Sequence, residues 1–481
     1  MITACQEDKK LDLTVYETNA DGAKLEEKTA FEKSDSSSTI SINPKETFQT
    51  ITGFGGSFTE SSAHLLTNLS SKKRDEVIQA YFGDEGARYS LTRTHIASCD
   101  FSLSNYTYAP VADDLELEHF TIAQDTSDLI PMILAATRVS SEGFKIIASP
   151  WTAPPWMKDN KEYVGGKLLP QYYNTYSHYF SKYLEEYKKQ DIEIWGVTVV
   201  NEPHGNGNNW ESMHFSPAEM TNLVQNHMGP ILESKGWGDI KILGYDQNRA
   251  GLKEWVDEMY KDKASSKYFD GTAIHWYEST YEVFPEALQY AHAKDTSKYL
   301  IETEGCVDSE VPAWQDDKWY WTKEATDWGW DWASEEEKYL HPKYAPAHRY
   351  ARDIIGCLNN WVDGWVDWNM VLDKQGGPNW FKNWCAAPVL ADIESDEVYF
   401  TPLFYVMSHF SRFIRPGAAR IGLEVSDKDL QATATKNPDG SIVLVVFNEG
   451  QSPKHFTINM KGSEKQISIN PQAIQTLIIN N

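Results

Sequence analysis

Two glutamates follow apolar, β-branched runs that lie far apart in the chain. The run at 194–201 leads into Glu202, and the run at 299–304 ends at Glu304. A carboxylate at such a place destabilises a fold unless it meets a partner or water. Two carboxyl groups that face each other across a sugar can hydrolyse a glycosidic bond, one as the acid and the other as the nucleophile or base.

The elements that must position these glutamates are short apolar runs that alternate with helix-like stretches such as 72–82, 175–187 and 217–235. Eight such alternations over about 350 residues predict a (β/α)₈ barrel. Strands four and seven of such a barrel lie nearly opposite each other, so their C-terminal glutamates could meet at the retaining distance of roughly 5 Å. The predicted strands are 50–53, 89–95, 145–151, 194–201, 242–245, 272–276, 299–304 and 364–368.

A doubly wound nucleotide-binding sheet is the alternative for an alternating pattern. It needs a glycine-rich phosphate turn, and 53–56 (G-F-G-G) is the candidate. Phe58 stands where the third glycine of that fingerprint belongs, so the dinucleotide signal fails.

Both chain ends are β-rich. Short alternating segments joined by turns, and one longer segment that holds two strands, predict an accessory antiparallel β-sandwich formed by both ends of the chain. The expected organisation is a signal or lipid-anchor remnant over 1–10, sandwich strands within 11–46, the catalytic barrel over 47–402 and the remaining sandwich over 403–481. The segments are 39–42, 421–425, 430–434, 442–447 and 466–479.

Charge and cysteine usage exclude several classes of protein. The chain has 44 basic and 70 acidic residues, a net charge of −26, which argues against a nucleic-acid partner. No run of 18 apolar residues marks a membrane span. The five cysteines form no C-x-x-C pair, and the opening I-T-A-C-Q is typical of the end of a bacterial lipoprotein signal. Lipidation of Cys5 would attach the protein to an outer membrane; a chance match is the other interpretation.

Several longer motifs carry a resemblance to a known family. The chain resembles glycoside hydrolase family 30 from about residue 50 to residue 450, and within it the branch that contains lysosomal glucosylceramidase. The family fold is a (β/α)₈ barrel with a β-sandwich built from both chain ends, in agreement with the pattern above. The motifs are N-E-P (201–203), H-W-Y (275–277), T-E-G-C (303–306), D-W-N (367–369), G-F-G-G (53–56), A-S-C-D-F (97–101), A-S-P-W-T (148–152) and G-G-P-N-W (376–380).

The resemblance implies a role for each matching residue. Glu202 would be the acid/base and Glu304 the nucleophile of a retaining hydrolase, with no metal or organic cofactor. Asn201 would donate to the sugar 2-OH, and Arg93 would hold the nucleophile ionised. The remaining matches are His275 and Tyr277, which orient the nucleophile, and Asp100, Phe101, Trp151, Trp368 and Asn383, which bind the glucosyl unit.

Glu302 departs from the family pattern, in which a smaller residue is usual. With a period of two, Glu302 and Glu304 should point to the same face, Glu302 one layer deeper. At that depth it needs a cationic or hydrogen-bonding partner. A buried salt bridge and a tuner of the nucleophile's pKa are the two interpretations.

The loops after the two catalytic candidates decide the substrate. The loop after Glu202 is polar (H-G-N-G-N-N-W), and the loop after Glu304 holds six tryptophans from Trp314 to Trp332, interleaved with acids. These residues suit a polar sugar in the leaving-group position, with Trp314 among the binding residues, although the tryptophans could equally pack the loop onto the barrel. We therefore expect a β-glucan substrate with β-1,6 linkages, whether β-1,6-glucan itself or β-1,6 branches of β-1,3-glucan.

Other functions remain open from the sequence. Glucosylceramide is the second substrate, and a fucoside or xyloside the third. A carbohydrate-binding protein on an inactive barrel would be a different class, and a transglycosylase would share the same residues. An enzyme of the bacterial cell envelope, periplasmic, secreted or attached to the outer membrane through Cys5, is the expected location.

Overall fold

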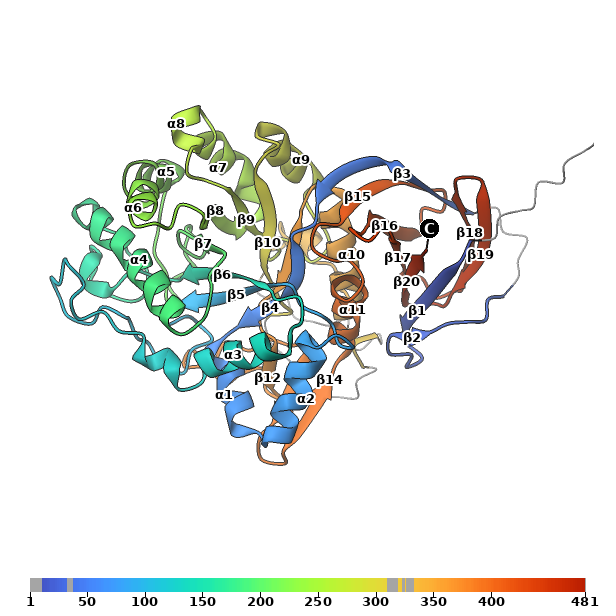
Figure 1. The fold of residues 1–481 in the computed structure, drawn as a ribbon, viewed down its shortest axis with the longest axis horizontal. Coiled ribbons are helices and arrows are strands. Elements are labelled where there is room, and N and C mark those ends of the chain that lie inside the picture. Colours follow the sequence, from blue (N-terminus) through green and yellow to red (C-terminus); the bar gives the residue numbers. More distant parts are fainter. Residues whose placement is uncertain (1–10, 33–37, 309–318, 322–324, 326–332, 481) are drawn as a thin grey trace, which may run out of the picture.

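The computed structural model describes residues 11–32, 38–308, 319–321, 325 and 333–480. Cys5 and Trp314, both singled out from the sequence, lie outside the described residues. A closed barrel lies beside a β-sandwich, with helices α10 (Pro346–Asn359) and α11 (Pro402–Ser411) between them (Figure 1). The predicted fold class, a (β/α)₈ barrel with a sandwich built from both chain ends, is confirmed.

Eight parallel strands of the described chain close the barrel, in the order β10-β11-β4-β5-β6-β7-β8-β9. Each overlaps or directly follows a run predicted from the sequence. The C-terminal ends of all eight strands therefore meet at one rim. The strands are β4 (Gly53–Phe58), β5 (Leu91–Ile96), β6 (Lys145–Pro150), β7 (Gly196–Thr198), β8 (Lys241–Asn248), β9 (Gly271–His275), β10 (Tyr299–Gly305) and β11 (Gly364–Asp367).

The first barrel strand differs from its prediction. The run 50–53 was expected to form it, but the strand begins at Gly53 and includes the glycines that looked like a turn. A Cβ atom on Gly55 would lie 2.0 Å from the carbonyl oxygen of Leu91, and one on Gly56 would lie 2.7 Å from the Met370 side chain. The glycines are therefore needed for close packing of β4 against its neighbours, which a propensity argument misses.

Helices follow the barrel strands along the chain and cover the ring. The predicted helices 72–82 and 175–187 are confirmed, but 217–235 is interrupted by a π-helical turn at Val224–Met228 just before Pro230, which lacks an N–H. No helix in the described ranges is both long and apolar enough to cross a bilayer. The helices are α1 (Glu60–Asn68), α2 (Ser71–Phe82), α3 (Leu129–Val139), α4 (Tyr173–Lys189), α5 (Pro217–Leu223), α6 (Gly229–Ser234), α7 (Leu252–Met259), α8 (Lys263–Ser266) and α9 (Pro285–Lys294), besides α10 and α11.

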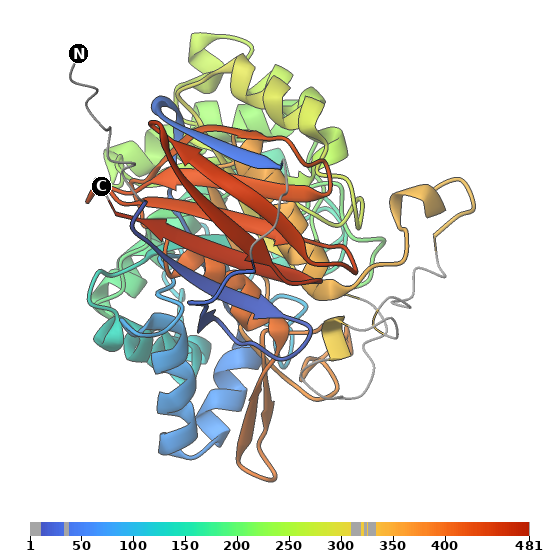
Figure 2. The ribbon, with the colours of Figure 1, turned by 90° about the vertical axis from the view of Figure 1, so that its right-hand side faces the viewer.

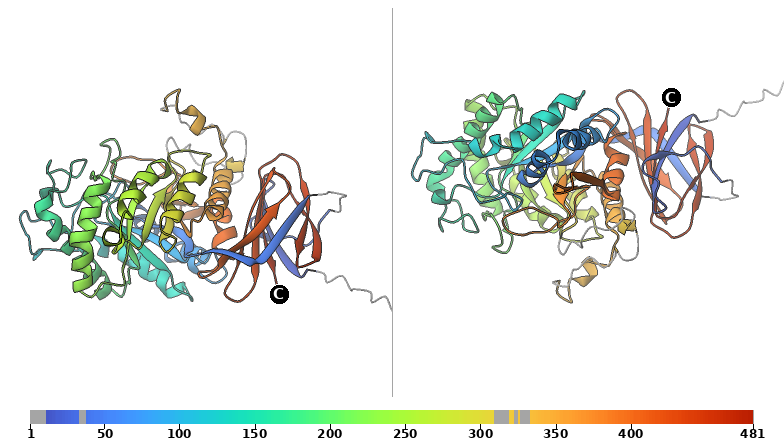
Figure 3. Two further views of the ribbon diagram at one scale, coloured as in Figure 1. Left: turned by 90° about the horizontal axis from the view of Figure 1, so that it is seen from above. Right: turned by 90° about the horizontal axis from the view of Figure 1, so that it is seen from below.

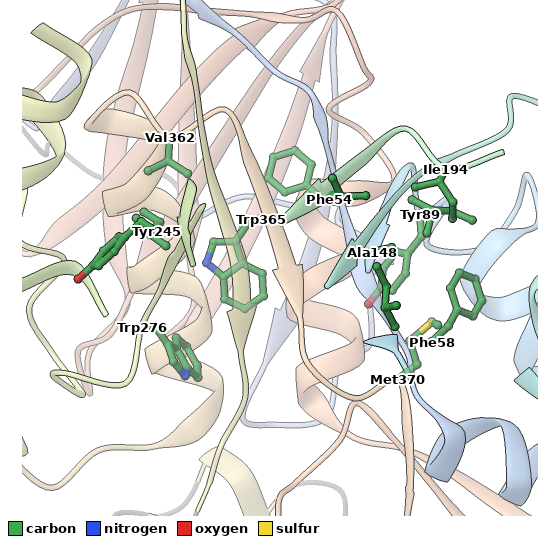
Figure 4. Close-up of a cluster of buried hydrophobic side chains, with 14 of the residues drawn as sticks. Phe54, Phe58, Tyr89, Ala148, Ile194, Tyr245, Trp276, Val362, Trp365 and Met370 are labelled. Carbon is green, nitrogen blue, oxygen red and sulfur yellow. The ribbon is translucent and has the colours of Figure 1, made fainter. Parts of the chain in front are cut away.

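Apolar side chains fill the barrel below its rim. Leu91, Ile147, Leu243, Ile301 and Val366 come from five strands and form one buried cluster in the interior. A second, larger cluster lies between the strands and the helices, and Figure 4 shows part of it. Because nearly all residues of the barrel strands are buried, these strands do not show the alternation of apolar and polar residues that is typical of a half-exposed sheet.

The sandwich combines strands from both chain ends, as Figures 2 and 3 show by the blue strands among the red. The strand order is β19-β18-β3-β15-β16-β17-β20-β1-β2. The prediction of a purely antiparallel arrangement is wrong at one place, because the start of the long β3 pairs in parallel with β18. The strands are β1 (Leu13–Asn19), β2 (Glu26–Glu27), β3 (Thr39–Thr50), β15 (Ala419–Val425), β16 (Leu430–Lys436), β17 (Ile442–Asn448), β18 (Lys454–Met460), β19 (Ser463–Ile469) and β20 (Ala473–Ile479).

A small three-stranded sheet follows the last barrel strand. It consists of β12 (Val371–Asp373), β13 (Val389–Asp392) and β14 (Glu397–Phe400). The loop between β12 and β13 brings Asn383 to the barrel rim, where its amide contacts Asp100.

A buried histidine connects the helix α11 to the sandwich. The ring nitrogens of His409 lie 2.8 Å from Thr476 Oγ1 on β20 and 2.9 Å from Thr18 Oγ1 on β1. Burial lowers the pKa of His409 to about 3. The imidazole is therefore neutral in the folded protein at neutral pH, and it joins the two chain ends to the last helix of the barrel side.

We expect His409 to make the fold acid-sensitive. An unfolded histidine has a pKa of about 6.5, so the unfolded state gains the proton first as the pH falls. The contribution of His409 to the free energy of unfolding is fully present above pH 6.5. It decreases by roughly 1.4 kcal/mol per pH unit between about pH 6.5 and pH 3. In His409→Gln, denaturant unfolding between pH 7 and pH 5 should show a smaller loss than in the native protein. His64→Gln, on the partly exposed α1 face, is the control; equal losses in the native protein and His409→Gln would contradict the assignment.

Candidate active site

A cavity of about 490 Å³ opens at the C-terminal rim of the barrel. Its volume lies in the range usual for small-molecule sites. Glu202 and Glu304 both line it, so the structure brings together the two glutamates predicted from the sequence. Six further predicted residues also line it: Asp100, Trp151, Asn201, Tyr277, Trp368 and Asn383.

Two donors fix the Glu304 carboxylate. Arg93 donates to Oε2 at 2.5 Å, and the Tyr277 hydroxyl donates to Oε1 at 3.0 Å. Burial raises the pKa of Glu304, and the positive charges of His275 and Arg93 oppose that rise. Each carboxylate oxygen therefore has one defined partner, and the group is held in one orientation at the cavity wall.

Glu202 lies on a sharp turn four residues after the end of the short strand β7. Its backbone takes the left-handed conformation, with φ of 49°. The turn is held because the Glu202 amide donates to the Asp246 carbonyl at 3.0 Å and the Gly205 amide donates to the Glu202 carbonyl at 2.7 Å. The side chain is 15% exposed, and Oε1 lies 3.5 Å from Nδ1 of His275. This carboxyl group is consequently more open to the cavity and less tightly held than Glu304.

Arg93 joins the glutamates to the barrel. Its guanidinium is fully buried and donates to Asp246 Oδ2 at 2.6 Å and to Asn201 Oδ1 at 2.9 Å, besides Glu304. It also lies 5.0 Å from the ring centre of Trp151. Because the Asn201 oxygen faces Arg93, the amide nitrogen of Asn201 is the end that remains for a ligand.

Asp246 is a site residue that the sequence analysis missed. Besides Arg93, its carboxylate contacts His275 Nε2 at 3.0 Å and accepts from the Thr303 hydroxyl at 2.7 Å. Despite burial, Arg93 and His275 hold the pKa of Asp246 well below its usual range. The predicted fifth strand was ended at Tyr245; reading that run one residue further to its polar end would have found Asp246.

His275 carries a positive charge between three carboxylates. Burial opposes the charged form, but the charge of Glu304 and the contacts with Asp246 and Glu202 raise the pKa of His275 to about 10. The imidazolium is therefore an orienting group for both glutamates, from a position behind the cavity wall.

Asp100 and the two tryptophans form the other side of the cavity. Asn383 donates to Asp100 Oδ2 at 3.0 Å, while Asp100 Oδ1 and Trp368 Nε1 have no hydrogen-bond partner among the described residues. The Trp151 and Trp368 rings stack on each other with their centres 4.8 Å apart. The two faces that contact each other are therefore not available to a sugar. Phe101 packs edge-on behind Trp368 at 6.2 Å and does not line the cavity.

The prediction that Glu302 and Glu304 share one face is wrong. Two residues of β10 oppose one residue of β9 between Glu302 and Glu304, which is a β-bulge. Glu302 therefore points away from the barrel interior, where Arg249 binds Oε2 at 2.6 Å and also pairs with Asp353 of α10 at 2.7 Å. Burial raises the pKa of Glu302 to about 8, although Arg249 opposes that rise. The buried salt bridge is found, but outside the cavity.

The comparisons with known proteins agree with this geometry. The sequence matches the model "Glycosyl hydrolase family 30 TIM-barrel domain" over residues 51–414 and "Glycosyl hydrolase family 30 beta sandwich domain" over residues 417–477. The chain belongs to glycoside hydrolase family 30. It is a glycoside hydrolase, and the predicted family and enzyme class are confirmed.

Several individual proteins are similar to this hydrolase. Lysosomal acid glucosylceramidase from Mus musculus is 33% identical over 430 residues, which cover 87% of this chain and 79% of that protein. The structure of SrfJ from Salmonella typhimurium has a TM-score of 0.87 at 29% identity, over 98% of this chain and 100% of that chain. The structure of the endo-β1,6-glucanase BT3312 has a TM-score of 0.82 at 26% identity, with the same two coverages.

We expect Arg249→Met to lower the free energy of unfolding by about 3–5 kcal/mol, because it leaves the buried Asp353 carboxylate without its cation and the buried Glu302 carboxyl group without its donor. Denaturant unfolding at pH 7 measures the change. Lys189→Met on α4 removes a cation from an exposed pair with Glu185 and is the matched control; its unfolding curve should overlay that of the native protein. A loss no larger than that of the control would show that the Arg249 network does not stabilise the fold.

Proposed function

We propose that the protein is a retaining β-glucosidase or glucanase that cleaves β-1,6-linked glucose in glucans by double displacement. The observation that carries the proposal is that two carboxyl groups in one cavity have different hydrogen-bonding environments. Glu304 is held by Arg93 and Tyr277, as a nucleophile must be, while Glu202 is open to the cavity and follows β7, three strands away around the ring. A retaining mechanism requires a separation of roughly 5 Å between such groups.

In the first step, Glu304 attacks the anomeric carbon while Glu202 protonates the departing oxygen. The C–O bond to the leaving group breaks as the bond to Glu304 forms. The Asn201 amide is placed to donate to the 2-OH, an interaction that strengthens as the oxocarbenium-like state develops. Arg93, His275 and Tyr277 hold the attacking carboxylate in its orientation.

In the second step, Glu202 removes a proton from water, which attacks the glycosyl–enzyme and releases Glu304. Formation of the glycosyl ester removes the negative charge of Glu304 from the site. The positive charge of His275 then acts mainly on Asp246 and Glu202. That change favours the ionised form of Glu202, which is the form that a general base needs.

The leaving-group side of the cavity supports a sugar substrate. Polar and aromatic side chains from the loop after β7 and from the end of β8 line it: Asn206, Asn209, Trp210, Gln247 and Asn248. Such side chains can bind hydroxyl groups and stack on a pyranose, whereas an aliphatic leaving group would leave the amides unpaired. The β-1,6 linkage is proposed by analogy with the endo-β1,6-glucanase BT3312.

Glucosylceramide hydrolysis is the second candidate. The identity of 33% to the mouse glucosylceramidase favours it over cleavage of a fucoside or a xyloside. Attachment of the protein to a bacterial envelope through Cys5 stays a prediction, which mass spectrometry of the cell-derived protein would check.

The role of each glutamate can be tested with a 2-fluoro glucoside that carries an activated leaving group. The native protein should gain the mass of one glycosyl unit, and Glu304→Gln should gain none. Glu202→Gln should still be labelled, because an activated leaving group needs no acid, but its turnover of disaccharides should fall roughly 10²–10⁴-fold. Glu302→Gln, on the same strand, is the matched control; if it alone prevented labelling, Glu304 would not be the nucleophile.

The linkage can be tested with a panel of β-linked glucose disaccharides and with glucosylceramide in detergent micelles. We expect kcat/KM for the 1,6-linked disaccharide to exceed that for the 1,3-linked one by roughly 10–200-fold, the discrimination that binding contacts can supply. Preference for the 1,3 linkage, or activity on glucosylceramide alone, would overturn the proposed substrate.

A further inference from the structure

A third carboxyl group, Asp308, lines the cavity beside the two glutamates. It follows β10 by three residues. The adjacent Val307 forms an isolated antiparallel bridge with Ala386, whose amide donates to the Val307 carbonyl at 2.8 Å. This bridge fixes the backbone at Asp308 against the segment that also carries Asn383. The position of the carboxyl group is therefore built into the rim and does not depend on a single side-chain contact.

One oxygen of this carboxyl group meets no donor from the part of the chain that the structure describes. Oδ1 of Asp308 is buried and has no hydrogen-bond partner among the described residues. A buried acceptor without a donor destabilises a fold, and native structures keep few of them. An acceptor that lines a binding cavity and has no donor within the described ranges is suited to a donor that arrives with a ligand.

The cation whose charge acts on Asp308, Arg349, makes its own contacts elsewhere. The guanidinium of Arg349 lies 3.7 Å from the ring centre of Trp276 and donates to the carbonyl oxygens of Trp276 at 3.0 Å and Ser279 at 3.3 Å. Burial raises the pKa of Asp308 to about 6, and the charge of Arg349 only partly opposes the rise. Arg349 thus acts on Asp308 from a distance and leaves its oxygen available.

Glu202 lines the same cavity, and its negative charge further raises the pKa of Asp308. Glu202 is the group that protonates the departing oxygen in the proposed reaction, so it stands beside the leaving group. The glucosyl unit that is transferred has its own acceptor, Asp100, which Asn383 orients. Asp308 is therefore assigned to the leaving-group side of the cavity.

We propose that Asp308 determines specificity for the leaving group, by accepting a hydrogen bond from a hydroxyl of the sugar that departs. This inference rests on the proposed function and names one residue that makes a polyhydroxylated leaving group the preferred one. A sugar brings the donor that Oδ1 lacks. An aryl leaving group without a hydroxyl brings none, and the oxygen then stays desolvated and unpaired, which is how sites built to bind a hydroxyl reject analogues that lack it.

The test compares two substrates in four proteins. The substrates are an aryl β-glucoside and the β-linked glucose disaccharide that the native protein cleaves fastest. The proteins are the native chain, Asp308→Ala, Asp308→Asn and the matched control Asp239→Ala, which removes an exposed aspartate outside the cavity. The measured quantity is kcat/KM for the disaccharide divided by kcat/KM for the aryl glucoside.

We expect this ratio to fall roughly 10–100-fold in Asp308→Ala, the usual value of a hydrogen bond to a charged group. It should fall less in Asp308→Asn, which keeps one acceptor oxygen, and stay unchanged in Asp239→Ala. An unchanged ratio in Asp308→Ala, or an equal loss on both substrates, would overturn the assignment. A native protein that cleaves no aryl β-glucoside would instead overturn the proposed function, so the two failures are distinguishable.

Discussion

The buried guanidinium of Arg93 is the constraint on which the site depends. It stands on β5 and reaches Ser149 on β6, Asn201 after β7, Asp246 on β8 and Glu304 on β10. A charge with no exposed surface is tolerated only where it is paired and its donors are satisfied. Every one of these partners must therefore keep its place, and the rim of the barrel is fixed by electrostatics where the apolar interior ends.

This arrangement gives different surroundings to two glutamates whose side chains are chemically identical. Glu304 receives donors on both oxygens, whereas Glu202 stands on a left-handed turn with the His275 ring 3.5 Å from one oxygen. The difference arises from the ends of β7 and β10 and not from the residue type. In a barrel, the last residues of each strand differ freely while the strands below them stay apolar, so chemistry and stability are carried by different layers.

The sequence predicted the barrel because eight apolar runs follow a regular spacing, and it predicted most of the rim because motifs fall at the ends of those runs. It failed where the backbone departs from a regular period. The β-bulges at Glu302–Glu304 and at Tyr245–Gln247 change which side chains face the cavity, and no local pattern marks them. Glu302 was placed on the wrong face for this reason, whereas Asp246 was missed because the predicted strand was ended one residue too early, at Tyr245. Glycines usually indicate a turn, but those of β4 are needed for close packing against Leu91 and Met370. Both partners lie far away in the sequence, so no local pattern reveals this packing.

The bulge in β10 also explains how one strand can hold two glutamates with opposite tasks. Glu302 faces the helices and joins Arg249 and Asp353, while Glu304 faces the cavity and joins Arg93. Each arginine neutralises the network on its own side of the strand, so the two networks do not compete for a cation. If β10 kept a strict period of two, both carboxylates would point to one face and repel each other across a buried gap. The extra residue of the bulge is therefore what allows a structural ion pair and the proposed nucleophile to stand two positions apart.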